Sequence, residues 1–204
     1  MANPNIAIGL RPINQNGTAW TGQATLCAVP SSQAGNIFLG DPVVALGGTD
    51  AYGCPLVGIA TAGANNPILG SMLSVSNGPG GGGGVAVSPI TQNSTVYRQA
   101  SIANYILVCD DPNCLFIVQE DSVGGAIAAS AAGFANGNLV AGSGSTVTGF
   151  SGWQLQSSSV SSSANTTYQV KIIGLSRGPG NSIGANADWV VRLNNPQFWS
   201  NTGV

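Results

Sequence analysis

The chain is 204 residues long, and only 6% of these are charged, against about a quarter in an ordinary soluble domain. Its five Lys and Arg residues and seven Asp and Glu residues give a net charge of −2. Five scattered cations are too few to form the basic patch that phosphate-driven nucleic-acid binding requires, and they disfavour electrostatic docking to anionic lipid.

The N-terminal segment, Met1–Asn5, has no cationic residue and no apolar run of signal length, so we expect no export signal. Gly, Asn and Pro interrupt every apolar stretch, so none is long enough to span a bilayer. The chain is therefore predicted to be soluble and made in a cytoplasm.

Short apolar segments, several of them alternating with polar residues, predict β-strands. In chain order these are 56–60, 68–75, 103–108, 114–120, 168–173 and 189–193. Turn-forming residues separate them at Asn16-Gly17, Gly47-Gly48, 77–79, Asp111-Pro112 and 178–181. We predict one all-β domain over 1–204: a sandwich or barrel, jelly-roll-like, of short antiparallel strands with long Gly/Ser-rich loops. An extended N-terminal arm (about 1–22) and a C-terminal tail (about 194–204) flank it.

Three segments depart from the strand pattern. The Ala-rich stretch 126–135 predicts one short helix of a turn or two, because nearby glycines weaken helix propensity. The glycine run Gly80–Gly84 and the serine-rich stretch 157–163 are typical of exposed loops. The glycine run could also be a place where another backbone approaches closely.

The low charge predicts a chain that works inside an assembly. Hydrophobic residues make up 43% of the sequence, which separates it from disordered chains. The polar remainder is mostly Gly, Ser, Thr, Asn and Gln, and a surface of this kind can be buried against a neighbour at small desolvation cost. A protease-resistant secreted protein is the alternative explanation.

Four cysteines, Cys27, Cys54, Cys109 and Cys114, allow three interpretations. Buried reduced thiols are favoured, a disulfide such as Cys109–Cys114 is the first alternative, and zinc is the second. The nearest pair has C-x₄-C spacing rather than the usual C-x₂-C of zinc sites, and the chain has no His.

The absence of His also excludes Ser-His-Asp and Cys-His catalysis. One G-x-S-x-G match, at 180–184, follows the Gly178-Pro179 turn rather than a buried strand, so we interpret it as turn chemistry. No glycine-rich segment has the spacing of a phosphate-binding loop. We therefore expect no enzyme, and we assign no catalytic, cofactor-binding or metal-ligating residue.

Paired carboxylates are the best remaining enzymatic pattern. Asp110-Asp111 and Glu120-Asp121 bracket the predicted strand 114–120. A strand separates such pairs by roughly 30 Å, too far for a glycosidase-type acid–base couple. Either pair could bind Ca²⁺ with loop carbonyls. We favour ordinary turn and strand-end roles.

The tryptophans divide by context. Trp189 lies on an apolar strand and is expected in the core, whereas Trp199, in the C-terminal tail, could anchor on a partner or fold back onto its own domain. Trp20 and Trp153 complete the set of four. The N-x-S/T matches at Asn16, Asn93 and Asn165 carry little weight without a secretion signal.

Several segments of the sequence resemble segments of a group of tailed-phage virion proteins. They occur in the same order, over roughly residues 9–195. They are Gly9-Leu-Arg-Pro12 with Trp20-Thr-Gly-Gln23, 37–44, Tyr97-Arg98, 105–112, 116–121, 172–175 and 181–190. The resemblance implies a capsid cement or decoration protein on the outside of an HK97-type shell. It implies the major capsid protein as partner, a homodimer or homotrimer, and a location on the virion after synthesis in the host cytoplasm. The Gly80–Gly84 run and the Cys109/Cys114 pair depart from the family pattern.

Three other readings remain open. The first is a receptor-binding or adhesive fibre or spike module, whose expected mark is a concave cluster of aromatic and acidic residues. The second is a hydrolase that works through carboxylates alone. The third, the major shell protein itself, fits poorly because no long helix or charged N-terminal arm is predicted.

Overall fold

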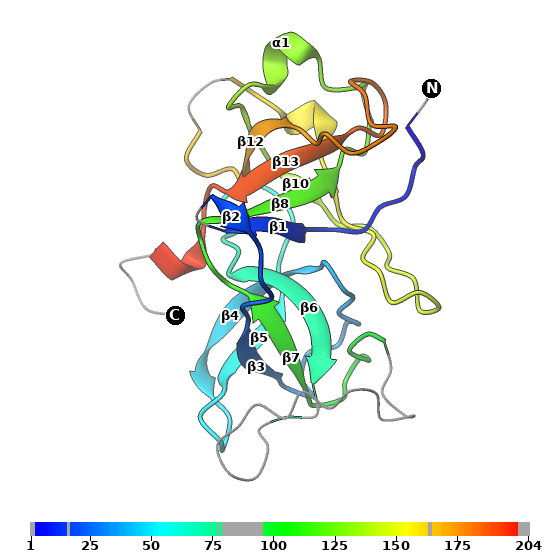
Figure 1. Cartoon of the computed structure of the whole chain (residues 1–204). Coiled ribbons are helices and arrows are strands. Elements are labelled where there is room, and N and C mark those ends of the chain that lie inside the picture. The colour runs from blue at the N-terminus through cyan, green and yellow to red at the C-terminus, as the bar shows by residue number, and fades with distance from the viewer. Residues whose placement is uncertain (1–2, 16, 77, 79–95, 163–164, 200–204) are drawn as a thin grey trace.

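The computed structural model describes residues 3–15, 17–76, 78, 96–162 and 165–199. The Gly80–Gly84 run, Asn16, Asn93 and parts of the turn at 77–79 and of the 157–163 stretch lie outside these residues. The described chain forms two lobes stacked one above the other, with the α1 helix at the far end of the upper lobe (Figure 1).

The strands and helices follow one another along the chain as β1 (Arg11–Gln15), β2 (Thr18–Ala19), β3 (Thr25–Val29), β4 (Pro42–Thr49), β5 (Pro55–Ile59), β6 (Gly70–Ser76), β7 (Asn104–Cys109), β8 (Cys114–Gln119), α1 (Ala129–Ala132), β9 (Asn136–Gly137), β10 (Leu139–Val140), β11 (Gln154–Leu155), the 3₁₀ turn η1 (Ser157–Ser159), β12 (Val170–Leu175), β13 (Asp188–Leu193) and the 3₁₀ turn η2 (Gln197–Trp199).

The lower lobe is a closed five-stranded barrel with the order β3-β5-β4-β6-β7. All neighbours are antiparallel except β3 and β5, which share one parallel bridge, Ala28 with Leu56. The barrel interior is filled by small and medium apolar side chains. They are Cys27, Val29, Ile37, Val43, Val57, Met72, Ile106 and Val108.

The upper lobe is an open six-stranded sheet with the order β2-β1-β8-β13-β12-β9, beside the two-stranded pair β10-β11. In β13, Trp189, Val191 and Leu193 are buried and the residues between them are not, which is the alternation expected when one face covers a core. The β1 strand joins this sheet through β8, so the chain begins in the upper lobe, forms the barrel and returns.

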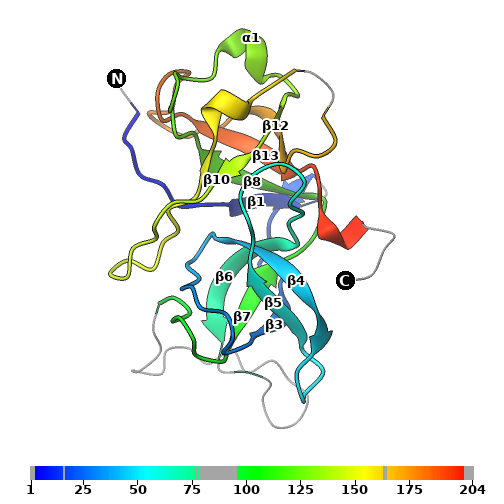
Figure 2. The same ribbon diagram turned by 180° about the vertical axis from the view of Figure 1, so that it is seen from behind.

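The two lobes are joined by backbone contacts at the waist. The Leu10 amide donates to the Gly40 carbonyl at 2.8 Å, and the Ser71 hydroxyl donates to the Leu10 carbonyl at 2.6 Å. On the other side of the waist, the Ile68 amide donates to the Asn195 carbonyl at 3.2 Å. The upper core also includes Ile68, from the segment that leads into β6. Figure 2 shows the same junction from behind.

The structure confirms the predicted all-β class with a barrel and one short helix. The α1 helix lies inside the predicted 126–135 stretch, and each of the six predicted strands overlaps an observed one. The prediction of a turn at Gly47-Gly48 was wrong, because both glycines lie within β4. Their positive φ values accompany a break in the pairing register, and the turn follows at 50–53. Part of the predicted N-terminal arm is the strand β1.

Candidate functional site

The predicted acidic pairs have structural partners. Glu120 is fully buried; its carboxylate accepts hydrogen bonds from the Trp189 indole at 2.9 Å, the Ile127 amide at 3.1 Å and the Ser122 hydroxyl at 3.0 Å. A carboxylate with three donors inside a core fixes its neighbours and leaves little room for a substrate. Glu120 therefore fastens β13 and the 122–127 loop to the end of β8.

Asp121 and Asp111 act as turn residues. Asp121 Oδ1 accepts from the Ser157 amide and hydroxyl at 2.9 and 2.8 Å and from the Val123 amide at 3.1 Å. Asp111 Oδ1 accepts from the Asn113 amide at 2.7 Å, the local bond expected of an Asp-Pro turn. Among the described residues, no three His, Cys, Asp or Glu side chains gather as a metal site would require.

The four cysteines are buried free thiols in the structure. Burial raises the pKa of Cys27 to about 12. A hydrogen bond with Cys114 lowers the pKa of Cys109, and the same contact, with burial, raises that of Cys114. The G-x-S-x-G match at 180–184 lies in a loop, where the Ser182 carbonyl and amide bond to the side chain of Asn3.

Arg98, from the Tyr97-Arg98 phrase, is fully buried in the barrel lobe. Its guanidinium donates to three backbone carbonyls, those of Gln33, Gly35 and Pro30, at 2.7, 2.8 and 2.8 Å. These carbonyls belong to the 30–36 loop, which has no strand partner, so Arg98 adds charged donors to the two that the Gln33 and Ser101 amides supply to Pro30 and Gln33. The residue is a structural clamp.

Asp41, from the phrase 37–44, closes the next turn. Its Oδ2 accepts from the Phe38 amide at 2.8 Å, and its side chain is 1% exposed. Burial raises the pKa of Asp41 to about 6, although hydrogen bonding to Ser151 and Phe38 acts in the opposite direction. Oδ1 is buried and makes no hydrogen bond of ordinary length, so desolvation of the charged form dominates.

Replacement of Asp41 by Asn is expected to remove a pH-dependent destabilisation. An aspartate with an ordinary pKa of 3.8 when unfolded and about 6 when folded favours the folded state fully below pH 3.8 and loses that contribution as the pH rises to about 6. The difference between the two pKa values corresponds to about 3 kcal/mol. Asn can still accept the Phe38 amide hydrogen bond without a charge.

Urea unfolding at several pH values between about 4 and 7 measures this effect. We expect the free energy of unfolding of Asp41→Asn, relative to the natural chain, to increase across this interval. The difference between the two proteins is the quantity to follow, because the pKa of Asp50 is lowered and that of Asp188 raised in both. A difference that stays constant with pH would show that Asp41 is ionised at its ordinary pKa.

The segments 9–12 and 37–44 come into contact where the backbone at Gly9 crosses the backbone at Gly40. A Cβ on Gly9 would lie 2.3 Å from the Gly40 carbonyl oxygen, and a Cβ on Gly40 would lie 2.2 Å from the Ile8 carbonyl oxygen. Both residues also have positive φ, +67° and +91°. Only glycine permits this approach and this backbone conformation together.

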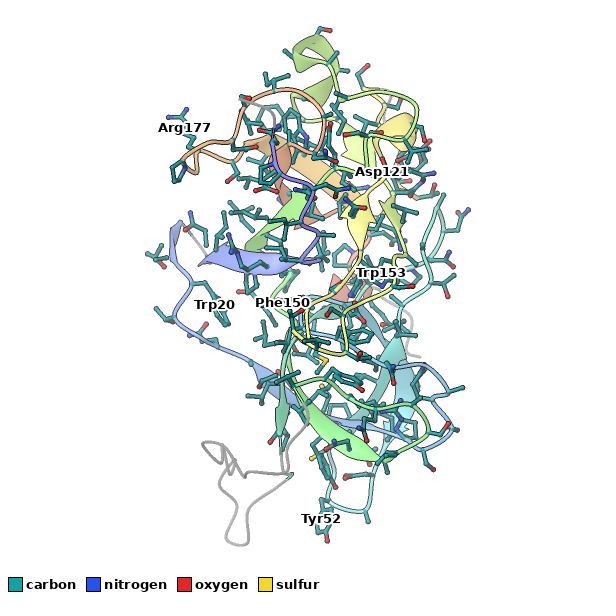
Figure 3. The ribbon with its side chains drawn as sticks, turned by 90° about the vertical axis from the view of Figure 1, so that its right-hand side faces the viewer. Trp20, Tyr52, Asp121, Phe150, Trp153 and Arg177 are labelled. Carbon is teal, nitrogen blue, oxygen red and sulfur yellow. The ribbon has the colours of Figure 1, made fainter. Side chains whose placement is uncertain are left out.

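Beside this crossing lies an apolar hollow of about 190 Å³ at the waist of the molecule, here called the waist hollow. It is lined by Ile8, Leu10, Arg11, Pro12, Leu39, Gly40, Met72, Leu73 and Phe150. The lining combines the start of the upper sheet, the barrel and the 142–152 hairpin, whose Phe150 is labelled in Figure 3. Phe150 and Met72 could not be associated with this site from the sequence, because no spacing connects them to residues 9–12.

Charge is distributed unequally between the lobes. From Thr25 to Cys109 the sequence has only three charged residues, Asp41, Asp50 and Arg98, and two of these are buried. Asp50 is thus the one accessible charge of the described barrel. Four large apolar side chains of the same lobe are exposed. They are Leu46, Tyr52, Val96 and Ile102, and together with Asp50 we call them the barrel face.

A second hollow, of about 310 Å³, contains the aromatic and acidic residues that an adhesive module would need. Its lining includes Phe38, Asp41 and Trp153. These side chains are almost completely buried, however, and the Asp41 carboxylate already caps the Phe38 amide. The hollow therefore offers little accessible aromatic surface or acceptor.

The tryptophans follow the expectations from the sequence where they can be compared. Trp189 is buried in the core, as predicted, and so is Trp153, whereas Trp20 packs partly buried against the same core. The side chain of Trp199 lies outside the described residues.

No helix among the described residues has the length and apolar character needed to cross a membrane.

The buried polar residues thus organise the fold, and two accessible features of the described residues are the waist hollow and the nearly uncharged barrel face. No protein-family model, no curated protein and no solved structure matches this chain.

Proposed function

We propose that the chain is a virion structural protein, a cement or decoration protein that binds the outside of an HK97-type phage shell and bridges its capsomers. The major capsid protein is the proposed partner, and neither nucleic acid nor membrane is needed for the interaction. The proposal begins from the sequence resemblance, in which no motif is catalytic.

The places of the resembling residues support the proposal. Gly9, Gly40, Arg98 and Glu120 all belong to the phrases that resemble virion proteins, and each occupies a position that holds the fold together. A resemblance carried by such residues describes a shared scaffold. The proposal therefore makes no use of a catalytic centre.

The observation that carries the proposal is the neutrality of the barrel. A protein that remains bound to a shell must bury a large surface, and buried charges cost several kcal/mol each unless they find partners. With Asp50 as its one accessible charge, the barrel face can be buried with almost no such penalty. We propose that the barrel lies against the shell and the upper lobe, which carries Lys171, Arg177 and Arg192, faces solvent.

Ile102 and Ile183 offer a matched test because their exposed fractions are 49% and 51%. Ile102 belongs to the barrel face, and Ile183 lies in the 176–187 loop of the upper lobe. Ile102→Asp is expected to weaken binding to purified shells that lack this protein by about tenfold or more, because it buries an unpaired charge. Ile183→Asp is expected to leave the affinity unchanged.

Co-sedimentation with the shells over a range of protein concentrations measures both affinities. Circular dichroism confirms that each variant is folded. Equal weakening by the two substitutions, or none by Ile102→Asp, would contradict the proposed orientation. Failure of the natural chain to sediment with shells at all would contradict the proposed function.

An adhesive module is the alternative function, and a different binding experiment distinguishes it from a cement protein. It predicts saturable binding to particular sugars on a glycan array and no requirement for the shell. The burial of Phe38 and Trp153 argues against a sugar site in the hollow that they line, since sugar-binding aromatic rings must present a face to the ligand.

A further inference from the structure

The waist hollow has a cation at its edge. Arg11 is exposed at the start of β1 and lines the hollow next to Leu10 and Pro12. Its charge acts on the half-buried Asp188, whose pKa is raised by burial and lowered by Arg11. A segment that fills the hollow would therefore match it best with one large apolar side chain and a carboxylate beside it.

The opposite side of the molecule carries such a pair. Phe198, in η2, is 62% exposed and borders a shallow depression of about 460 Å³ together with Asp110, Asp111 and Thr25. The η2 turn lies at the left edge of Figure 1, whereas the 142–152 hairpin that carries Phe150 lies at the right. One copy of the chain cannot bring its own Phe198 to its own waist hollow.

Phe198 is held in place rather than left on a loose tail. The neighbouring Gln197 side chain accepts from the Ala45 amide at 2.7 Å and donates to the Ala45 carbonyl at 3.2 Å, as a paired strand residue would. The Gln197 amide donates to the Ile68 carbonyl at 2.8 Å. These bonds hold the backbone next to Phe198, so less entropy is lost when this residue binds than on a loose tail, which favours its use as an anchor.

We propose that Phe198 of one copy enters the waist hollow of a second copy, with Asp110 of the first facing Arg11 of the second. The two surfaces differ, so the contact is head-to-tail; it closes into a ring where the rotation between copies permits and continues as a filament where it does not. The waist hollow is about six times the ~30 Å³ that one water molecule takes in the liquid, room for a single side chain. The inference specifies the homo-oligomer that accompanies the proposed function, but it can be tested without a shell.

The other exposed acidic and aromatic pair, Asp50 with Tyr52, is a poorer partner for Arg11. Asp50 Oδ2 accepts from the Tyr105 hydroxyl at 2.6 Å, and Oδ1 accepts from the Tyr52 and Cys54 amides at 2.9 and 2.8 Å. Both carboxylate oxygens are therefore engaged within the β4–β5 turn. No comparable set of bonds to its carboxylate holds Asp110 among the described contacts.

Charge exchange between two variants tests the contact most sharply. Sedimentation velocity from about 1 to 100 μM measures self-association of the isolated full chain. Arg11→Glu alone and Asp110→Arg alone are each expected to lower the association constant about tenfold or more, because each places like charges opposite one another. In an equimolar mixture of the two variants, both kinds of contact between unlike copies pair opposite charges, once in the natural order and once reversed, so the mixture is expected to form hetero-dimers and larger alternating assemblies.

Two matched controls separate the contact from general effects. Arg177→Glu changes an exposed cation elsewhere in the upper lobe, and Phe134→Ser removes an aromatic side chain that is 71% exposed near α1; neither is expected to change association. Phe198→Ser is expected to weaken it about as much as Arg11→Glu. Circular dichroism verifies folding of every variant.

The inference is overturned if the natural chain stays monomeric over the whole concentration range. It is also overturned if Arg11→Glu and Arg177→Glu weaken self-association equally. Absence of hetero-dimers in the mixture overturns the pairing of Arg11 with Asp110. Shell binding by a monomeric chain would overturn this inference and leave the proposed function standing, so the two can fail separately.

Discussion

Replacement of Arg98 by Met is expected to lower the free energy of unfolding by about 3–5 kcal/mol. The guanidinium is fully buried and supplies hydrogen bonds to three carbonyls of the 30–36 loop. Met fills a similar volume but donates none, so the three carbonyls lose their charged donor, and those of Pro30 and Gln33 keep only the Gln33 and Ser101 amides. For a chain of this length the loss corresponds to a melting temperature lower by about 10 °C.

Urea denaturation and thermal unfolding followed by circular dichroism measure the change. Arg98→Lys keeps the charge but not the planar fork, so its free energy of unfolding is expected to lie between those of Arg98→Met and the natural chain. Arg177→Met, at an exposed position, is the control and should stay within about 0.5 kcal/mol. A small loss for Arg98→Met would show that water or a rearranged loop replaces the clamp.

Replacement of Gly40 by Ala is expected to cost about 4 kcal/mol or more. The new Cβ would lie 2.2 Å from the Ile8 carbonyl oxygen, in a residue whose φ is +91°. Backbone atoms cannot turn aside as a flexible side chain can, so the crossing of residues 8–10 over residue 40 must open. The same movement would deform the waist hollow and weaken self-association.

Gly180→Ala isolates the conformational part of this cost. Gly180 also has a positive φ, +80°, but a Cβ there would meet no atom within 4 Å. Its substitution is expected to cost about 1–2 kcal/mol. Similar losses at both positions, measured by urea denaturation, would mean that the clash at Gly40 relaxes easily and that the crossing is not a fixed feature of the fold.

The strands that could be predicted from the sequence are those with a clear alternation. In β12, Val170 and Ile172 are buried and the Lys171 between them is not, and this alternation is readable in the sequence. The longer strands β1, β3 and β4 were missed, because β1 contains Pro12 and polar residues, β3 has a short, mixed sequence and β4 contains Gly47-Gly48. The identity of β1 and β3 as strands depends on partners far along the chain, β8 and β7.

Glycine produced the clearest local error. Gly47-Gly48 has the composition of a hairpin turn, yet the two residues lie inside β4 and the chain reverses only at the turn that Asp50 closes. Composition cannot separate a bulge from a turn, because both require positive φ. The partner strand β5 decides between them.

The candidate sites could be predicted only in part. The low charge of the segment 25–109 is visible in the sequence, but the burial of Arg98 and Asp41, which makes the barrel face almost neutral, is not. The waist hollow combines residues from four separate segments, so it depends on the crossing of the chain at Gly9 and Gly40. The family resemblance marked both glycines without indicating that they touch.

Cryo-electron microscopy of purified virions from the source of this chain tests the central claim most directly. The account predicts density for the protein on the outer shell at regular symmetry positions, with the barrel against the capsomers and head-to-tail contacts between neighbouring copies. Density only at the tail or at a vertex would contradict the cement function and favour the adhesive module. Absence of the chain from the particle would contradict a virion role altogether.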